Sequence, residues 1–345
     1  MVEEINSRDI DLFRKLIASS KSAVVVSHTK PDGDAIGSAL GISKALQNVG
    51  LKTTVVLPDD YPAYYDFLPQ SNEILVASKM WDRVEAIVDS ADLLVCVDFN
   101  NFSRTDCLEN LLQKSTAQKV LIDHHLNPDT SAFDLVFSDN TVSSASELVY
   151  WVVTKAFGKD VIAYKGAMAL YTGICTDTGS FSYSANSPTL YLAVAQLLEK
   201  GINVNEIHNK IYQTYSMGRM KLLGHCINNC LKIFPEMKMA YFSVSQKDLK
   251  MFDAEKGDLE GVVNYTLMMK DIEVGALVKE GDDGKVRISF RSKYDFDVNR
   301  FASKYFEGGG HRKASGASSV YDIEKTCTYM EDCFRLELLN NENNK

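Results

Sequence analysis

The chain has 345 residues, 45% of them hydrophobic and 24% charged. It is therefore long enough for two domains with separate cores and has the composition of a globular protein. Its formal net charge is −9, and it has no run of Lys or Arg long enough to form the basic face with which proteins usually follow long nucleic acids. A small anionic substrate held by a few local bases fits this charge better than a long polymer.

The termini and the cysteines indicate the compartment. Residues 1–6 carry Glu3 and Glu4 where a signal peptide would carry basic residues. No apolar run approaches the roughly 20 residues that a membrane-spanning helix needs. The seven cysteines include no C-x-x-C pair, which argues against a disulfide framework and a zinc ribbon. We therefore expect a cytoplasmic protein without a membrane segment.

The first half of the chain alternates short apolar runs with helical patterns. Strands are predicted at residues 23–26, 53–57, 73–76, 92–97 and 119–122. Helices are predicted at residues 36–48 and 145–157, and the second opens with Ser144 and Glu147 in a capping-box pattern. This alternation predicts an α/β fold with a doubly wound, mostly parallel sheet and right-handed crossovers.

After residue 187 the pattern changes twice. Helices are predicted at residues 189–200, 205–212 and 217–232, followed by strands at 274–279 and 285–290 with a turn at 281–284, and a helix at 298–306. We therefore expect a first α/β domain over residues 1–187, a helical linker over 188–236, and a smaller α+β domain over 237–345.

The tripeptide Asp123-His124-His125 is the most informative feature of the sequence. It directly follows the apolar stretch 119–122, at the carboxyl end of a strand, where open α/β sheets bind their ligands. A carboxylate and two imidazoles are costly to bury unless something positive pairs with them. The alternative is a structural, hydrogen-bonded histidine pair.

Three more acidic clusters follow apolar, strand-like runs. They are His28 with Asp32 and Asp34, then Asp98, and then Asp177 within Thr176–Phe181. Each has an ordinary interpretation in isolation: a Pro-Asp-Gly turn with Asp34 capping a helix, a turn or cap residue at 98, and a polar turn at 176–181. Four such clusters at strand ends are hard to assign to turns alone, and together they predict a divalent-metal site for phosphate chemistry.

The loop from His28 to Asp34 indicates the kind of metal. It places one imidazole and two carboxylates between a strand and a helix, and Asp32 and Asp34 flank a glycine, so that they could point to different cations. Oxygen and imidazole ligands without a thiolate favour Mn²⁺, with Mg²⁺ or Co²⁺ also compatible.

A glycine-rich segment near the C-terminus predicts a phosphate contact. Gly308, Gly309 and Gly310 allow close backbone approach to an anion, and His311 and Arg312 would grip it. Arg291, followed by Ser292 at the end of a predicted strand, offers a second basic contact. The alternative is a flexible loop with incidental charge.

His225, Cys226 and Cys230 lie at helical spacing on one segment. Because soft, buried core residues are far commoner than metal ligands in such a pattern, we expect them to pack in a core.

The chain resembles the DHH–DHHA1 phosphoesterases, which are named for the Asp-His-His tripeptide. The resemblance covers nearly the whole chain and rests on five motifs: His-Thr-Lys-Pro-Asp-Gly-Asp-Ala-Ile-Gly-Ser at 28–38, Asp98, Asp-His-His at 123–125, Thr-Asp-Thr-Gly-Ser-Phe at 176–181, and Gly-Gly-Gly-His-Arg-Lys-Ala-Ser-Gly at 308–316. It is closest to the short cytoplasmic branch, the nanoRNase-type oligoribonucleases that also act as 3′-phosphoadenosine-5′-phosphate phosphatases.

The resemblance implies a role for each site residue. One Mn²⁺ would be held by His28, Asp32 and Asp98, and the other by Asp34, Asp98, His124 and Asp177, with Asp98 bridging. His125 would face the scissile phosphate, and Asp123 would orient the imidazoles. Arg104 occupies a position where the family commonly has an arginine. Asp98 is followed by Phe99 and Asn100, where many relatives have a small hydroxyl residue, so the lining beside the bridging aspartate departs from the family pattern.

The implied mechanism is two-metal hydrolysis. Cations about 3.5–4 Å apart would activate a hydroxide and stabilise charge on the phosphoryl oxygens. The residues Arg291, Ser292, Gly308–Gly310, His311 and Arg312 of the second domain would bind substrate. The implied substrates are short oligoribonucleotides and 3′,5′-bisphosphonucleotide. The sequence does not determine the oligomeric state, and a homodimer is compatible with it.

Three alternatives stay open. The same site could serve a phosphodiesterase for cyclic or linear dinucleotide signals, although the chain lacks the sensory segments of many such relatives. A RecJ-like exonuclease on long single strands is less compatible, because the chain lacks room for an added OB-fold and has no basic channel. A nucleotide-binding module without catalytic activity is the third, and the full set of metal ligands argues against it.

Overall fold

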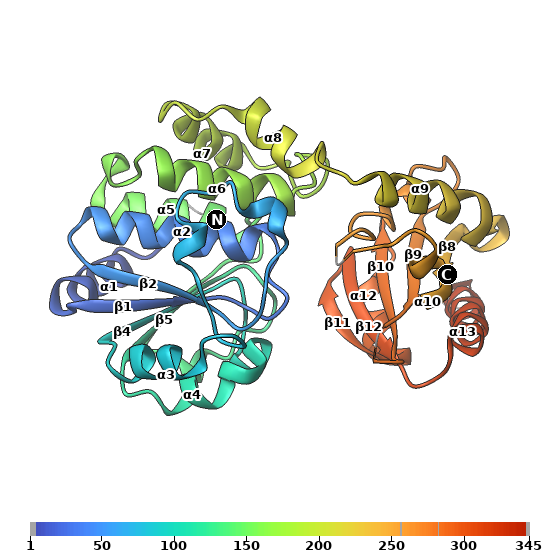
Figure 1. The fold of residues 1–345 in the computed structure, drawn as a ribbon, viewed down its shortest axis with the longest axis horizontal. Helices are drawn as coiled ribbons and strands as arrows, with labels where there is room; N and C mark the ends of the chain where they lie inside the picture. Colours follow the sequence, from blue (N-terminus) through green and yellow to red (C-terminus); the bar gives the residue numbers. More distant parts are fainter. Residues whose placement is uncertain (1–4, 256, 282, 343–345) are drawn as a thin grey trace. The chain divides into compact units, whose positions relative to one another are not determined.

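The computed structural model describes residues 5–255, 257–281 and 283–342, and the chain divides into two compact units, one ending at Thr214 and the other beginning at Tyr215 (Figure 1). Residues 1–4, part of the acidic start that argued against a signal peptide, and residue 282, in the predicted turn, lie outside the described residues. Within the described part of the chain, no helix has both the length and the apolar character needed to cross a membrane.

The first unit is built on a six-stranded, fully parallel sheet. Its order is β3-β2-β1-β4-β5-β6. The strands are β1 (Ser22–Val26), β2 (Lys52–Leu57), β3 (Leu75–Val76), β4 (Leu93–Val97), β5 (Gln118–Asp123) and β6 (Leu135–Ser138). The order reverses between β1 and β4, the position at which doubly wound sheets bind ligands beyond the strands' carboxyl ends. The predicted doubly wound sheet is confirmed.

Helices cover both faces of this sheet (Figure 1). The helices are α1 (Ser7–Ser19), α2 (Gly33–Asn48), α3 (Trp81–Asp89), α4 (Glu109–Lys114), α5 (Ala145–Phe157), α6 (Tyr164–Asp177), α7 (Pro188–Leu198) and α8 (Val204–Tyr212). Val25 of β1 faces the core shared with α1, α2, α5 and α6, whereas Val24 and Val26 face the core shared with α3 and α4. The apolar strands are thus buried on both sides, as parallel strands require.

Glycines bring α2 and α6 into close contact. A Cβ at Gly37 would lie 2.7 Å from the backbone nitrogen of Gly173, and one at Gly41 would lie 2.3 Å from Leu170. At the start of α2, a Cβ at Gly33 would lie 2.3 Å from the Oγ1 of Thr176. Because the glycines remove these clashes, the end of α6 reaches the beginning of α2.

The stretch predicted as a linker is divided between the units. Ile207 and Ile211 of α8, with Leu190 of α7, are buried in the first unit's core. Helix α9 (Met217–His225) contributes Leu222 to a core of the second unit. The three-part division by residue number stays a prediction.

The second unit contains a mixed six-stranded sheet of order β11-β12-β10-β9-β8-β7. The strands are β7 (Leu231–Phe234), β8 (Met239–Val244), β9 (Val274–Glu280), β10 (Val286–Ser292), β11 (Glu307–His311) and β12 (Ala314–Ser319). Only β8 and β9 among these neighbours pair in parallel. This mixed sheet with helices agrees with the predicted α+β domain.

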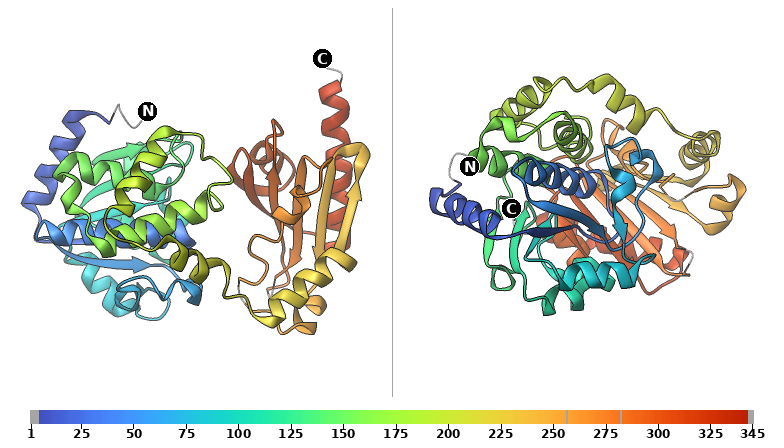
Figure 2. Two further views of the ribbon diagram at one scale, coloured as in Figure 1. Left: turned by 90° about the horizontal axis from the view of Figure 1, so that it is seen from above. Right: turned by 60° about the vertical axis from the view of Figure 1, so that its left-hand side comes forward.

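Two cores sandwich this second sheet. Tyr241 and Phe290 face a core with α12 (Val298–Tyr305) and α13 (Ile323–Glu342), and α13 runs along the sheet (Figure 2). Phe242 and Leu277 face the opposite core with α9 and the π-helical turn Cys226–Cys230. The remaining helices are α10 (Gln246–Met251) and α11 (Asn264–Leu267), and the 3-10 turns of the chain are Ala63–Tyr65, Ser71–Glu73, Phe102–Leu108, Thr130–Ala132, Lys159–Val161 and Pro235–Met237.

Several local predictions were wrong. The helix predicted at 217–232 ends earlier, because Leu231 begins strand β7 and pairs with Phe242. The glycine-rich segment, for which a flexible loop was the alternative interpretation, is strand β11, and its pairing with β12 outweighs the low strand propensity of glycine. Of the two hydrogen bonds of the predicted capping box, one forms: the Ser144 hydroxyl accepts from the backbone nitrogen of Glu147. The Glu147 carboxylate accepts from the backbone nitrogen and hydroxyl of Ser143 and not from the backbone of Ser144.

Candidate active site

The ionisable clusters meet at one edge of the first sheet. His28 lies just beyond β1, Asp98 directly follows β4, and Asp123 ends β5. These three strands are neighbours in the order β1-β4-β5, so their carboxyl ends lie side by side. The site therefore forms where the strand order reverses.

Asp98 lies at the centre of the cluster. Its backbone is left-handed, with φ of 63°, a conformation that Asp tolerates better than most residues. The carboxylate is buried, with one oxygen, Oδ2, 3.3 Å from the Nε2 of His28 and the other, Oδ1, 3.5 Å from the Nε2 of His124. Each oxygen of Asp98 thus faces a different histidine.

His28, Asp32 and Asp98 form one potential metal-ligand group. One ligand atom of each lies within 4.8 Å of the others. The Nδ1 of His28 lies 2.8 Å from the carbonyl oxygen of Thr29, which accepts a hydrogen bond from it. The Nε2 of His28 therefore faces the other two ligand residues. One oxygen of Asp32 caps α2 by accepting from the backbone nitrogens of Asp34 and Ala35. The other oxygen of Asp32 has no such bond among the described residues.

Asp34, His124 and Asp177 form a second potential group, again with ligand atoms within 4.8 Å of one another. The Nε2 of His124 lies 3.9 Å from Asp34 and 3.6 Å from Asp177. The Asp34 carboxylate does not cap its own helix. It accepts from the backbone nitrogens of Ala145 and Ser146, at the amino end of α5.

Asp177 reaches this group from a helix. The sequence predicted that it follows a strand, and that prediction was wrong, because Asp177 is the last residue of α6. An apolar run such as the one before it fits a buried helix as well as a buried strand. Its position beside Asp34 follows from the glycine-mediated packing of α2 against α6.

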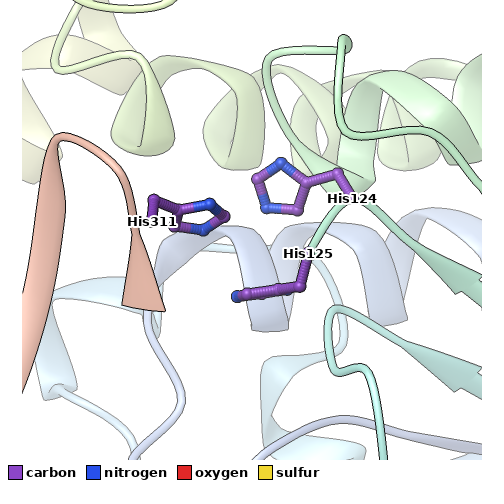
Figure 3. Close-up of side chains that lie close together, drawn as sticks. All are labelled: His124, His125 and His311. Atoms are coloured by element: carbon purple, nitrogen blue, oxygen red, sulfur yellow. The ribbon is translucent and has the colours of Figure 1, made fainter. Parts of the chain in front are cut away.

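Asp123 and His125 complete the edge, and Figure 3 shows the imidazoles of His124 and His125 projecting from the segment after β5. The Nδ1 of His125 donates to Oδ1 of Asp123 at 2.7 Å and lies 3.8 Å from Asp98. This bond directs Nε2 of His125 away from Asp123. Oδ2 of Asp123 is fully buried and has no hydrogen-bond partner among the described residues.

The charges in the site shift one another's pKa. Burial lowers the pKa of His28 and His124, but the Asp98 carboxylate and its acidic neighbours outweigh burial and raise these values to about 9 and about 10. Burial, together with the neighbouring carboxylates, raises the pKa of Asp34, and burial raises that of Asp177 to about 6. The buried carboxylates thus favour protons on the two imidazoles, and an added cation could take the place of those protons.

Two supporting residues hold the His28 loop. The carboxylate of Asp59 accepts from the hydroxyl of Thr29 and the backbone nitrogen of Lys30, and the carbonyl oxygen of Arg104 accepts from the backbone nitrogen of Thr29. Sequence reasoning missed Asp59, although it also follows a predicted strand, 53–57. Arg104, in the turn Phe102–Leu108, also lies close enough for its charge to oppose protonation of His28.

The second unit presents a basic row at one end of its sheet. Ala314 of β12 pairs directly with Arg291 on one side and His311 on the other. Directly paired residues project to the same face of a sheet, so the two basic side chains flank a small residue. The next row on that face is Ser289, Gly316 and Gly309, and a Cβ at Gly316 would meet nothing within 4 Å. This face is therefore open beside its basic residues.

The other predicted contacts of this unit have mainly structural partners. A Cβ at Gly308 would lie 2.5 Å from the carbonyl oxygen of Gly316, and Gly310 has a φ of 143°. The hydroxyl of Ser292 is buried and donates to the carbonyl oxygen of Phe296. Arg312 is exposed and donates to the carbonyl oxygen of Asp295.

Comparison with known proteins agrees with this arrangement. Residues 22–174 match the N-terminal domain of the DHH family, and residues 236–334 match the DHHA1 domain. A crystal structure of an exopolyphosphatase-related protein from Bacteroides fragilis is 33% identical, with a TM-score of 0.93, and the match covers 97% of this chain and 98% of that one.

Two curated relatives are also similar over long stretches. The bifunctional oligoribonuclease and PAP phosphatase NrnA of Bacillus subtilis is 28% identical over 322 residues, which cover 92% of this chain and 95% of the relative. The cyclic-di-AMP phosphodiesterase GdpP of the same organism is 28% identical over 314 residues, covering 87% of this chain and 45% of the relative. With both domains matched in order and the Asp-His-His tripeptide at the edge of the first sheet, the chain belongs to the DHH–DHHA1 family of phosphoesterases.

Proposed function

We propose that this protein is a Mn²⁺-dependent phosphodiesterase that hydrolyses short oligoribonucleotides to mononucleotides. We further propose that it removes the 3′-phosphate of 3′-phosphoadenosine-5′-phosphate. The observation that carries this proposal is the Asp98 carboxylate, whose two oxygens face His28 and His124 in separate ligand groups. The similarity to bifunctional oligoribonuclease and PAP phosphatase supports the choice of substrate.

We assign one cation to His28, Asp32 and Asp98, and a second to Asp34, Asp98, His124 and Asp177. The donor set supports this assignment, because it consists of carboxylates and imidazoles, the ligands that Mn²⁺ prefers. A pair of bound cations would activate water and stabilise negative charge on the phosphoryl oxygens.

The protein's own groups orient the reaction. His125, whose Nδ1 donates to Asp123, would turn its Nε2 toward the scissile phosphate. Asp123 thereby fixes the tautomer of His125 as well as its orientation. Arg291 of the second unit would supply positive charge for another substrate phosphate, and His311 a hydrogen bond beside it. A few local bases suffice for a short substrate, in keeping with the net charge of −9.

A second candidate function uses the same site. The similarity to the cyclic-di-AMP phosphodiesterase favours hydrolysis of cyclic or linear dinucleotide signals. Both activities break a phosphodiester bond between two nucleotides, so substrate preference alone separates them.

Release of mononucleotides from a 5′-phosphorylated diribonucleotide tests the proposal. Parallel reactions with Mn²⁺ contain 3′-phosphoadenosine-5′-phosphate, a cyclic dinucleotide or a long single-stranded DNA. We expect fast cleavage of the diribonucleotide that a chelator abolishes and that Asp98→Asn removes. The control Asp82→Asn makes the same chemical change at an exposed residue of α3 and should keep full activity.

The results separate the candidates. Preference for the cyclic dinucleotide would favour the second function, and preference for the long strand would overturn both. Turnover that is indifferent to chelator and to Asp98→Asn would overturn the assignment of the metal site.

A further inference from the structure

The second unit contains a cluster of metal-ligand side chains that the phosphoesterase site does not use. His225 ends α9, Cys230 ends the π-helical turn that follows, and Asp248 lies in α10. A ligand atom of each lies within 4.8 Å of the other two. The sequence placed the cysteines in a core, which is where they lie. Folding adds Asp248, a carboxylate that helical spacing could not connect to them.

The cluster lies at the boundary between core and solvent. Cys226 and Cys230 are buried against Leu222 and Phe242. The side chain of His225 is 17% exposed to solvent, and that of Asp248 is 20% exposed. A thiol is thus shielded from bulk water while an imidazole and a carboxylate remain reachable, so an ion could enter from the solvent side.

Neighbouring groups fix the orientation of the imidazole and the carboxylate. The Nε2 of His225 lies 2.9 Å from Oδ1 of Asp248, and its Nδ1 lies 3.1 Å from the amide of Asn229. The other oxygen of Asp248 accepts from the backbone nitrogen and the hydroxyl of Ser245, in a capping box. An ion bound between Nε2 of His225 and Oδ1 of Asp248 would replace the proton that they share and release it to solvent, while the outer partners Asn229 and Ser245 keep both side chains in place.

Cys226 is the candidate for a fourth position. It is four residues before Cys230 in the π-helical turn, and its thiol contacts that of Cys230, although it is not one of the three residues whose ligand atoms all lie within 4.8 Å of one another. A His–Asp pair alone is an ordinary hydrogen bond. Two thiols, an imidazole and a carboxylate together match the ligands of structural zinc, which is four-coordinate and tetrahedral.

We propose that His225, Cys230 and Asp248 bind a divalent transition-metal ion of the zinc type, with Cys226 as the fourth ligand. Soft thiolate ligands distinguish this site from the carboxylate and imidazole groups of the first unit, which favour harder cations. A bound ion would tie the end of α9 to α10 within the second unit. The proposal does not depend on the substrate of the phosphoesterase site.

Co²⁺ is the probe, because a thiolate ligand gives it a charge-transfer absorption that carboxylates and imidazoles do not. The full-length protein is stripped with a chelator, kept reduced and titrated with Co²⁺. We expect a thiolate-to-cobalt band that one equivalent of Zn²⁺ removes. Asp98→Ala, which disables the first unit's site, should keep the band, whereas Cys230→Ser should lose it. The matched control Cys333→Ser changes a buried thiol of α13 outside the cluster and should keep the band.

Asp248→Asn provides a variant that leaves both thiols in place. It should weaken Co²⁺ binding at least roughly tenfold, which keeps the proposal testable if Cys230→Ser does not fold. Absence of the band in the reduced wild-type protein would overturn the proposal. So would a band of equal strength in Cys230→Ser, or an unchanged Co²⁺ affinity in Asp248→Asn.

Discussion

The two units present their ionisable residues in opposite ways. At the edge of the first sheet, Asp98 and Asp123 are buried, and backbone or side-chain bonds hold the groups around them. On the second sheet, Arg291 and His311 are only partly buried, on a face lined by glycine and serine. The first arrangement is preorganised, as a site for bond breaking must be. The second arrangement leaves an open face beside the two basic side chains, which suits the proposed binding of a substrate phosphate.

Replacing a proposed metal ligand of the first unit should have the largest effect. His124→Ala removes an imidazole within 4 Å of three carboxylates. We expect kcat for the diribonucleotide to fall about 10³-fold or more, because groups that act as a unit fail together. Steady-state kinetics with saturating Mn²⁺ measure this loss. A fall in kcat of less than tenfold would contradict our inference that the first unit breaks the bond while the second unit binds the substrate.

The packing of α2 against α6 offers the next test. A Cβ at Gly173 would lie 2.0 Å from the hydroxyl of Ser146 and 2.7 Å from Oδ1 of Asp34. Gly173→Ala should therefore lower the free energy of unfolding by about 1–3 kcal/mol and weaken metal binding through Asp34. Denaturant unfolding and metal titration measure the two effects.

Gly224→Ala is the matched control. Gly224 also lies in a helix, α9, but a Cβ there would meet nothing within 4 Å. Alanine is the better helix former by about 1 kcal/mol, so this variant should be as stable as the wild type or more so. Equal destabilisation by the two substitutions would contradict the role of close packing at Gly173.

These tests separate what the sequence predicts from what folding adds. Asp98 and the Asp123–His125 tripeptide were predictable at the site, because each follows an apolar run and parallel strands end at a common edge. Asp177 was predicted in the site but on the wrong element. Its apolar run carries no signal that separates a buried helix from a buried strand.

Other features depend on contacts between distant segments. Nothing in the local sequence indicates that Asp34 accepts from the start of α5, because residues 34 and 145 meet only through tertiary packing. The glycine-rich segment likewise forms a strand only because β12 pairs with it. Local propensity correctly assigns glycine to loops on average, and the pairing overrides it here.

Arg291→Ala should sharpen the comparison from the side of the second unit. If this residue binds a substrate phosphate, its loss removes a charge-assisted hydrogen bond of about 1.5–3 kcal/mol. We expect KM to rise about tenfold or more, with kcat changed less than about twofold. The control Arg335→Ala removes an exposed arginine of α13 that, among the described residues, pairs with nearby Asp332, and it should leave both constants unchanged. A fall in kcat with KM unchanged would assign Arg291 to the chemistry instead.

The smallest effect, proton release, tests the preorganised charge of the first unit directly. In the metal-free protein the pKa of His28 is about 9 and that of His124 about 10. Both side chains are therefore in the protonated, positively charged form near neutral pH. A metal ligand must be deprotonated, and each histidine should therefore release one proton when the ions bind. The apparent affinity should rise with pH until the solution passes these pKa values.

Calorimetric titration with Mn²⁺ in buffers of different ionisation enthalpy counts the protons released. His124→Gln should release one proton fewer than the wild type, because glutamine carries no proton to lose. Both pKa values are raised above the usual 6.5, so in the absence of metal these imidazoles stabilise the fold fully below about pH 6.5 and lose that contribution as the pH rises through 9 to 10. Added Mn²⁺ should therefore protect the fold most at alkaline pH, where the ions replace the missing protons. If the number of protons released is zero and metal affinity does not change with pH, then the two histidines are not ligands, and the buried edge of the first sheet would need another explanation.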